Sequence, residues 1–252
     1  MERVDDTGFG GIRVIQTKGS GYGVDAVLLA AFAAGDSGAK GLPKDAAKPL
    51  RIADLGTGSG AVAFILHHKL GSARITGYDI NPDAADRAAR ACAMNGLEKD
   101  VDFVCADIKG MPGRDPSLRE SFDAVVTNPP YFRRTPDEPG AAEPDERYLA
   151  RHETSAGIAD FAETAAAMLK EGGSLYMVHR PDRLADIIFE LRKAGIEPKE
   201  MQPVAPRPGA AANIVLIHGV KGARPELRML PEIAVHESGG GYTEEIIRYY
   251  ER

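Results

Sequence analysis

The chain has 252 residues, of which 43% are hydrophobic and 27% charged, with a net charge of −6 and two cysteines, Cys92 and Cys105. This length suits one large α/β domain with small terminal additions, and two cysteines make neither a disulfide framework nor a metal cluster. The charged N-terminus is unlike a signal peptide and no apolar stretch reaches membrane length, so we expect a cytoplasmic protein without a membrane partner or a bound metal.

The first 49 residues precede the regular part of the sequence and are expected to form an N-terminal extension or lid. Residues 4–16 are β-like and contain several glycines. A helix is expected from Asp25 to Ala34, with Asp25 as its N-cap. Tyr22 lies just ahead of that helix, where it would either cover a cofactor or pack beneath the helix. Residues 35–49 form a polar linker.

A strand, a glycine-rich loop and a helix follow one another from Arg51. The strand 51–55 carries Asp54 near its end, the loop is Gly56-Thr57-Gly58-Ser59-Gly60, and a helical run covers residues 61–70. Glycines adopt positive φ and let a ligand approach the backbone closely, so this pattern indicates the start of a nucleotide-binding βαβ unit. Asp54 would orient the loop or meet the ammonium group of a ligand.

Two further strands each end at an acidic residue. Asp79 follows the strand 74–78 and Asp107 comes just after the strand 101–105. Folds of this kind hold a ribose through its hydroxyls at the first of these positions, which leaves the second for an adenine amino group. Asp is also a good helix N-cap and a common loop residue, so the three acids are meaningful mainly as a set. A ligand with an ammonium, a ribose and an adenine is S-adenosylmethionine.

The segment Asn128-Pro129-Pro130-Tyr131 follows an apolar strand at residues 122–127. Two consecutive prolines fix φ and remove two backbone donors, which produces a stiff corner with free carbonyl groups. Open α/β sheets place their chemistry at the carboxyl ends of strands, where this corner would lie. The corner would accept hydrogen bonds from an amino group and stack on the ring that carries it. The same residues would also make an ordinary turn.

Strands and helices alternate through the rest of the chain. The other expected elements are a helix at 82–94 capped by Asn81, a loop at 109–120, a helix at 156–170 that stops at Gly172-Gly173, a strand at 174–179, a helix at 181–193, antiparallel strands at 196–206 and 213–220, a strand or arm at 226–236, and a helix at 243–250 capped by Thr243. Alternation of this kind predicts an α/β, doubly wound, Rossmann-like sheet that is mostly parallel and has an antiparallel edge. We expect an extension at 1–49, a catalytic domain at 50–220, and a C-terminal extension at 221–252 packed on it.

At this point the chain resembles the class I S-adenosylmethionine methyltransferases. Residues 54–60 are similar to their first motif, Asp79 to their ribose-binding acid, and Asp107 to their adenine-contacting acid. Residues 128–131 are similar to the catalytic motif of the branch that methylates amino groups. Segments 16–29, 150–153 and 241–245 give a narrower resemblance to the bacterial transfer-RNA adenine-N6 methyltransferases that modify position 37 of a valine transfer RNA.

The motifs and the resemblance together imply a set of site residues. The catalytic residues would be Asn128, Pro129, Pro130 and Tyr131. The cofactor-binding residues would be Tyr22, Asp25, Asp54, Gly56, Thr57, Gly58, Gly60, Asp79, Ile80, Asp107, Ile108 and Asn128. The substrate-binding residues would be Arg133, Arg134, Arg151 and His152. No metal is required, and transfer RNA is the expected partner.

The acidic balance of the chain counts against an RNA substrate, because phosphate contacts usually need a basic surface. The arginines after the catalytic motif would form a local basic rim, or they would be scattered, solvated charges. Three alternatives stay open: a protein-glutamine methyltransferase, a small-molecule methyltransferase, and a cofactor-binding protein without turnover. The glutamine methyltransferases usually carry a helical domain ahead of the core, and about 50 residues leave little room for one.

Overall fold

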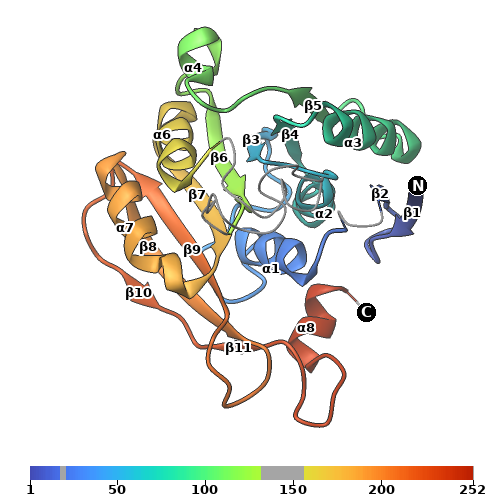
Figure 1. Cartoon of the computed structure of the whole chain (residues 1–252). Helices are drawn as coiled ribbons and strands as arrows, with labels where there is room; N and C mark the ends of the chain where they lie inside the picture. Colours follow the sequence, from blue (N-terminus) through green and yellow to red (C-terminus); the bar gives the residue numbers. More distant parts are fainter. Residues whose placement is uncertain (18–20, 132–155, 252) are drawn as a thin grey trace, which may run out of the picture.

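The computed structural model describes residues 1–17, 21–131 and 156–251 of the chain (Figure 1). Within these residues the core is a nine-stranded sheet of order β10-β8-β9-β7-β6-β3-β4-β5, with β11 also paired to β8. The strands are β3 (Leu50–Leu55), β4 (Ala73–Asp79), β5 (Val101–Cys105), β6 (Phe122–Thr127), β7 (Leu169–His179), β8 (Ile196–Ala205), β9 (Ile214–Lys221), β10 (Arg228–Met229) and β11 (Ile233–Ala234).

The sheet is mostly parallel, as the alternation of strands and helices predicts. Strands β5, β4, β3, β6 and β7 run parallel, and β9 is antiparallel to both β7 and β8. The predicted fold class is therefore confirmed. One detail differs from the expectation: β10 and β11 pair in parallel with β8, so the antiparallel pair does not end the sheet.

Helices cover both faces of the sheet. In Figure 1, α1 and α2 lie on one side of it, and α6 and α7 on the other. Successive residues of β3 alternate between the two cores: Ile52 packs with α1 and α2, whereas Ala53 and Leu55 pack with α6 and α7. This alternation is the period-two pattern of a strand buried on both faces. The helices are α1 (Val24–Ala33), α2 (Ala61–Leu70), α3 (Pro82–Asn95), α6 (Ile158–Met168) and α7 (Leu184–Lys193).

Both ends of the chain pack on the α1 and α2 side. The antiparallel strands β1 (Glu2–Asp6) and β2 (Arg13–Thr17) form a separate two-stranded sheet, and β2 packs against α3. The terminal helix α8 (Glu244–Tyr249) starts at the predicted cap, Thr243, whose hydroxyl accepts the Ile246 N–H at 3.4 Å. Its buried residues Ile246 and Tyr249 join the core that contains α1. The exact division of the chain at residues 49/50 and 220/221 stays a prediction.

The structure corrects three predicted boundaries. The first helix begins at Val24 with Gly23 as its N-cap, so Asp25 lies in the first turn. Helix α6 ends at Met168, and Gly172-Gly173 lies inside β7, because pairing with β6 extends that strand back to Leu169. The predicted loop at 109–120 contains α4 (Met111–Arg114) and a 3-10 turn at Pro116–Leu118, each of which has a proline in its first turn.

Candidate active site

The glycine-rich loop bends around the end of β4. The backbone N–H groups of Gly56 and Thr57 both donate to the Tyr78 carbonyl, at 2.8 and 3.0 Å, and Gly60 N–H donates to the Thr57 carbonyl at 2.9 Å. These bonds join the carboxyl end of β3 to the neighbouring strand before α2 begins. The loop is therefore a fixed turn at the carboxyl edge of the sheet, where an open α/β fold binds its ligand.

Two glycines of the loop are there for different reasons. Gly60 has φ +78° and a Cβ there would lie 2.7 Å from the Phe103 ring, so close packing demands glycine. Gly58 has φ +57°, yet a Cβ there would meet no heavy atom within 4 Å among the described residues. Open space beside a left-handed glycine is the geometry that lets a ligand approach the backbone.

Asp79 holds this loop from the end of β4. Its two carboxylate oxygens accept the Gly58 N–H at 2.8 Å and the Asn81 N–H at 2.9 Å. A carboxylate at this strand end has the chemistry to accept hydroxyl hydrogen bonds, as the ribose-binding acids of such folds do. The next residue, Ile80, is exposed, as an apolar side chain against an adenine ring would be in the free protein.

Asp54 is fully buried beneath the loop. The Thr57 hydroxyl donates to its Oδ2 at 2.6 Å, so this aspartate orients the loop, one of the two roles that the sequence suggests. Burial, helped by the negative charge of Asp79 and opposed by the bond from Thr57, raises the pKa of Asp54 to about 7. A buried carboxyl group with a pKa near neutrality has a strong preference for a cationic neighbour.

The third strand end contributes Asp107 and Ile108. Because β5 pairs in parallel with β4, Asp107 lies at the same edge of the sheet as Asp79. It is half-buried, and its Oδ1 accepts the Lys109 N–H at 3.0 Å. Ile108 is buried in the core on the α6 side, and its carbonyl accepts the Thr164 hydroxyl. Its side chain therefore supports the site from within the core.

The diproline corner comes directly after β6. The last residue of that strand, Thr127, donates its hydroxyl to the Leu55 carbonyl at 2.8 Å, which joins the corner to the end of β3. Pro129 is buried, whereas Asn128 and Pro130 are half-buried. Within the described residues no hydrogen bond engages the Asn128 side chain, so its amide is available to a ligand.

Tyr131 ends the corner and is fixed by the N-terminal helix. Its hydroxyl donates to Asp25 Oδ2 at 2.7 Å. Burial and the Asp25 carboxylate raise the pKa of Tyr131 well above its ordinary value, so the phenol stays protonated and remains a donor. Burial also raises the pKa of Asp25, and the bond from Tyr131 opposes that effect. The structure thus connects Asp25 to the catalytic corner, while its predicted contact with the cofactor stays a prediction.

The other predicted site residues divide into two groups. Tyr22 is half-buried, packs against the core that contains α1, and donates its hydroxyl to the Thr7 carbonyl at 3.4 Å, which agrees with the packing interpretation. Arg133, Arg134, Arg151 and His152, the predicted substrate-binding residues, lie outside the described residues.

Sequence reasoning missed His179, the last residue of β7. Its ring lies against Tyr131, with 5.2 Å between ring centroids and a 58° angle between ring planes, and the side chain is fully buried. The signal was present in the sequence: His179 ends the predicted strand at 174–179, and strand ends supply the site in this fold.

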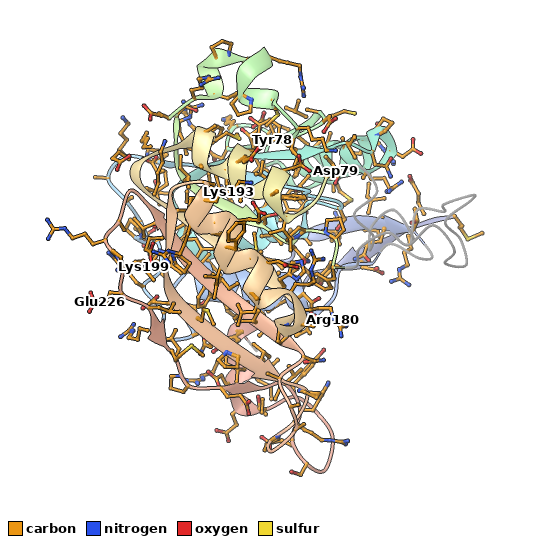
Figure 2. The ribbon with its side chains drawn as sticks, turned by 60° about the vertical axis from the view of Figure 1, so that its left-hand side comes forward. Tyr78, Asp79, Arg180, Lys193, Lys199 and Glu226 are labelled. Atoms are coloured by element: carbon orange, nitrogen blue, oxygen red, sulfur yellow. The ribbon has the colours of Figure 1, made fainter. Side chains whose placement is uncertain are left out.

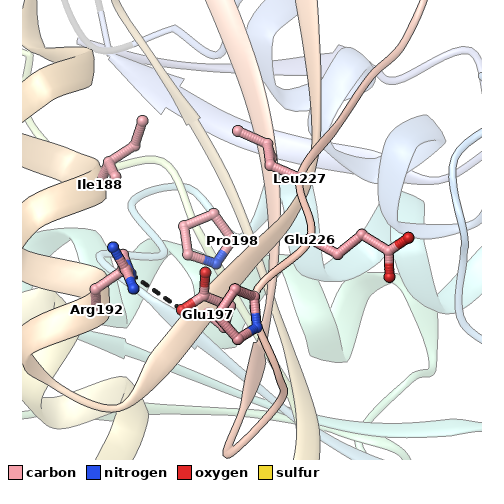
Figure 3. Close-up of a pocket in the computed structure, with 7 residues that line it drawn as sticks. Ile188, Arg192, Glu197, Pro198, Glu226 and Leu227 are labelled. Atoms are coloured by element: carbon pink, nitrogen blue, oxygen red, sulfur yellow. Dashed lines mark hydrogen bonds and ion pairs between the residues drawn. The ribbon is translucent and has the colours of Figure 1, made fainter.

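A separate hollow of about 270 Å³ lies between α7, β8 and residues 225–227. Arg192 and Glu197, which are joined at 3.1 Å, lie on its wall (Figure 3). Figure 2 shows Glu226 on the opposite side of the molecule from Asp79 and Arg180, which lie at the ends of β4 and β7. This hollow therefore plays no part in the candidate active site.

The described part of the chain also bears on two other features, a metal site and a membrane-spanning helix. No group of three or more His, Cys, Asp and Glu side chains there is arranged to hold a metal ion. None of the helices in that part has the length and apolar character needed to cross a membrane.

Comparisons with known proteins agree with this geometry. A family model described as a methyltransferase domain matches residues 52–143. A solved structure from Agrobacterium tumefaciens, titled a predicted O-methyltransferase, has a TM-score of 0.68 and 25% identity, and the match covers 90% of this chain and 95% of that one. The chain is an S-adenosylmethionine-dependent methyltransferase with a Rossmann-like sheet.

Three curated relatives of this chain have names that specify a methyl acceptor. Two are named tRNA1(Val) (adenine(37)-N6)-methyltransferase: one from Porphyromonas gingivalis, 30% identical over 66% of this chain, and one from Bacteroides fragilis, 28% identical over 90% of it. The matches span 60% of the first relative and 87% of the second. A release factor glutamine methyltransferase from Deinococcus radiodurans is 33% identical over 58% of this chain and 51% of its own length.

Proposed function

We propose that this methyltransferase acts on an exocyclic amine, the N6 amino group of adenine in transfer RNA, in the cytoplasm. The observation that carries the proposal is the corner after β6. There the Asn128 amide has no partner among the described residues, and the neighbouring Tyr131 is held in place by Asp25. A fixed aromatic ring beside unengaged acceptors suits a flat base that carries an amino group.

The corner would make a poor nucleophile reactive. The lone pair of an adenine amino group is delocalised into the ring. The Asn128 side-chain oxygen and the Pro129 carbonyl would accept hydrogen bonds from its two N–H groups, which favours a tetrahedral nitrogen with an exposed lone pair. These acceptors are already in position before reaction, so they stabilise the transition state without reorganising. Stacking of the base on Tyr131 would contribute about 1–3 kcal/mol to its binding.

The strand ends fit S-adenosylmethionine. Asp79 lies at the end of β4 and accepts the Gly58 N–H, Ile80 is exposed beside it, and a Cβ at Gly58 would meet no heavy atom within 4 Å among the described residues. Asp54, buried with a pKa of about 7, is suited to a cationic group close by. The cofactor supplies an activated methyl group, and the task of these residues is to seat it next to the Asn128 corner.

The alternatives predict different acceptors. Relatives named as transfer-RNA adenine methyltransferases match up to 90% of this chain, whereas the release factor glutamine methyltransferase matches 58% of it. Methyl transfer to a hydroxyl usually calls for a general base, and the corner after β6 offers neutral acceptors instead. These points favour an amine on a nucleic acid over a glutamine, a hydroxyl or a small molecule.

Transfer of labelled methyl groups tests the proposal. The protein is incubated with methyl-labelled cofactor and with separate pools of transfer RNA, ribosomal RNA and cellular protein. Label recovered as N6-methyladenosine from digested transfer RNA supports the proposal. Label found only in protein, with glutamine as its site, contradicts it and favours the glutamine methyltransferase.

The Asn128→Ala variant tests the role of the corner. We expect methyl transfer to fall below detection while the dissociation constant for the cofactor, measured by calorimetry, changes by less than about threefold, because Asn128 acts in the transition state. If cofactor affinity falls as far as activity does, Asn128 is a structural residue and the mechanism is wrong.

A further inference from the structure

His179 lies at the level of the catalytic corner but outside it. The parallel register of β6 and β7 pairs Thr127, the last residue of β6, with Met177, so His179 comes two residues after the last paired position, at the edge where the diproline corner begins. The imidazole is fully buried and packs against the Tyr131 ring at 5.2 Å. A polar side chain buried at a strand end next to a substrate-stacking ring needs a hydrogen-bonding role to offset its lost hydration.

The hydrogen bonds of the ring fix its tautomer. The Arg180 backbone N–H donates to His179 Nδ1 at 2.8 Å, so Nδ1 is the acceptor and carries no proton. A neutral imidazole then carries its proton on Nε2. Burial lowers the pKa of His179 to about 4, so the ring is neutral at physiological pH. Nε2 is buried and has no hydrogen-bond partner among the described residues. Within that part of the chain, His179 therefore keeps a buried N–H donor without an acceptor.

The order of the strands places this donor on the substrate side. The predicted cofactor residues from Asp54 to Ile108 lie at the ends of β3, β4 and β5, which are on one side of β6, whereas His179 ends β7 on the other side. A group that binds at the corner after β6 comes between the two sides. The missing acceptor for Nε2 thus belongs to the methyl acceptor, not to the cofactor.

We propose that His179 Nε2–H donates a hydrogen bond to a ring nitrogen of the base to be methylated, and so helps to select adenine. The inference rests on the proposed function, because a glutamine side chain offers no ring nitrogen. Tyr131 would hold the face of the base, Asn128 its amino group and His179 its edge. Three fixed contacts define the orientation of a planar ring, whereas stacking alone leaves it free to rotate.

Three variants separate the donor from the shape of the ring. His179→Phe keeps an aromatic ring against Tyr131 and removes both nitrogens. His179→Asn keeps an acceptor for the Arg180 N–H and has no donor at the Nε2 position. His179→Gln places an amide N–H close to the Nε2 position. The measurement is kcat/KM for an RNA stem-loop that wild type methylates, with the cofactor dissociation constant determined for each variant.

We expect the Phe and Asn variants to lose about tenfold or more in kcat/KM, chiefly through KM, since a lost hydrogen bond in a buried site costs that much. The Gln variant should recover most of the loss, and cofactor affinity should stay within about threefold of wild type in all three. Stem-loops with 1-deaza-, 3-deaza- or 7-deazaadenosine at the target identify the acceptor. One of these substitutions should lower kcat/KM of the wild type by the same factor as His179→Phe does. The same substitution should not lower kcat/KM of the Phe variant any further.

The inference is overturned if the Phe and Asn variants methylate as well as wild type. It is also overturned if cofactor affinity falls in step with activity in these variants. A third contrary result is that every deaza substitution lowers kcat/KM of the Phe variant further. Failure of the proposed function looks different. Wild type would then label no adenosine in any RNA, and the inference would fall with the function before any variant is compared.

Discussion

At the scale of single residues, Asp25 is the least expected contributor to the site. It lies in the first turn of α1, 106 residues before Tyr131, whose hydroxyl it holds at 2.7 Å. We predict that Asp25→Ala lowers kcat about tenfold or more by releasing the Tyr131 ring, while Asp25→Asn, which keeps an acceptor oxygen, retains most activity.

A double-mutant cycle with Tyr131→Phe checks this positioning role. If Asp25 acts through the Tyr131 hydroxyl, the two substitutions together cost no more than either alone. If Asp25 instead contacts the cofactor, Asp25→Ala raises the cofactor dissociation constant and its effect adds to that of Tyr131→Phe.

We expect Asp54 to make cofactor binding depend on pH. Its pKa of about 7 means that the free protein carries a proton there below neutrality, and a cationic ligand favours the ionised form. Binding below pH 7 must therefore release that proton. We predict that the dissociation constant for S-adenosylmethionine falls by up to about tenfold per unit as the pH rises toward 7, and levels off above it.

Calorimetry in buffers of different ionisation enthalpy measures the released proton directly. The Asp54→Asn variant should bind with little dependence on pH. Methylthioadenosine, which has no amino-acid moiety and no positive charge, is the matched control ligand and should bind wild type equally at pH 6 and pH 8. If the Asp54→Asn variant still binds the cofactor with a pH dependence, a group other than Asp54 is responsible for that dependence.

At the scale of elements, α8 carries two neighbouring isoleucines in opposite environments. Ile246 is fully buried in the core with α1, and Ile247 is 40% exposed. We predict that Ile246→Ala lowers the free energy of unfolding by about 2–5 kcal/mol, because it leaves a cavity. Ile247→Ala should change it by less than about 0.5 kcal/mol. Urea denaturation compares the two, and equal effects would show that α8 is not a fixed part of the core.

The elements also show where sequence reasoning succeeds. The strand, the loop 56–60 and the helix α2 were predictable because glycine geometry and an apolar run are local signals. The cap residues Asn81 and Thr243 were predictable for the same reason. The pair Gly172-Gly173 led to a wrong end for the preceding helix, because glycines usually stop helices. Here the pairing of β7 with β6 extends the strand back to Leu169. The bond from Tyr131 to Asp25 and the contact between the rings of His179 and Tyr131 depend on tertiary packing, which no local pattern encodes.

At the scale of the whole molecule, the net charge of −6 would limit how the proposed RNA substrate is held. Each phosphate contact contributes about −0.7 to −0.9 to the slope of log affinity against log salt. We predict a slope no steeper than about −4, measured by fluorescence anisotropy with labelled stem-loop between about 50 and 200 mM salt. Asn128→Ala should give the same slope, because it contacts the base. A slope near −8 would require an extensive basic surface and contradict this prediction.

Strand β8 is hydrogen-bonded along both of its sides, to β9 on one and to β10 and β11 on the other. An unpaired strand margin attracts matching strands from other molecules, and very short outer strands are one natural defence against this. Residues 228–234 thus act as a barrier to self-association. Cleavage ahead of them would leave this side of β8 unpaired and open to strands from other molecules, and we expect loss of solubility to appear before loss of methyl transfer.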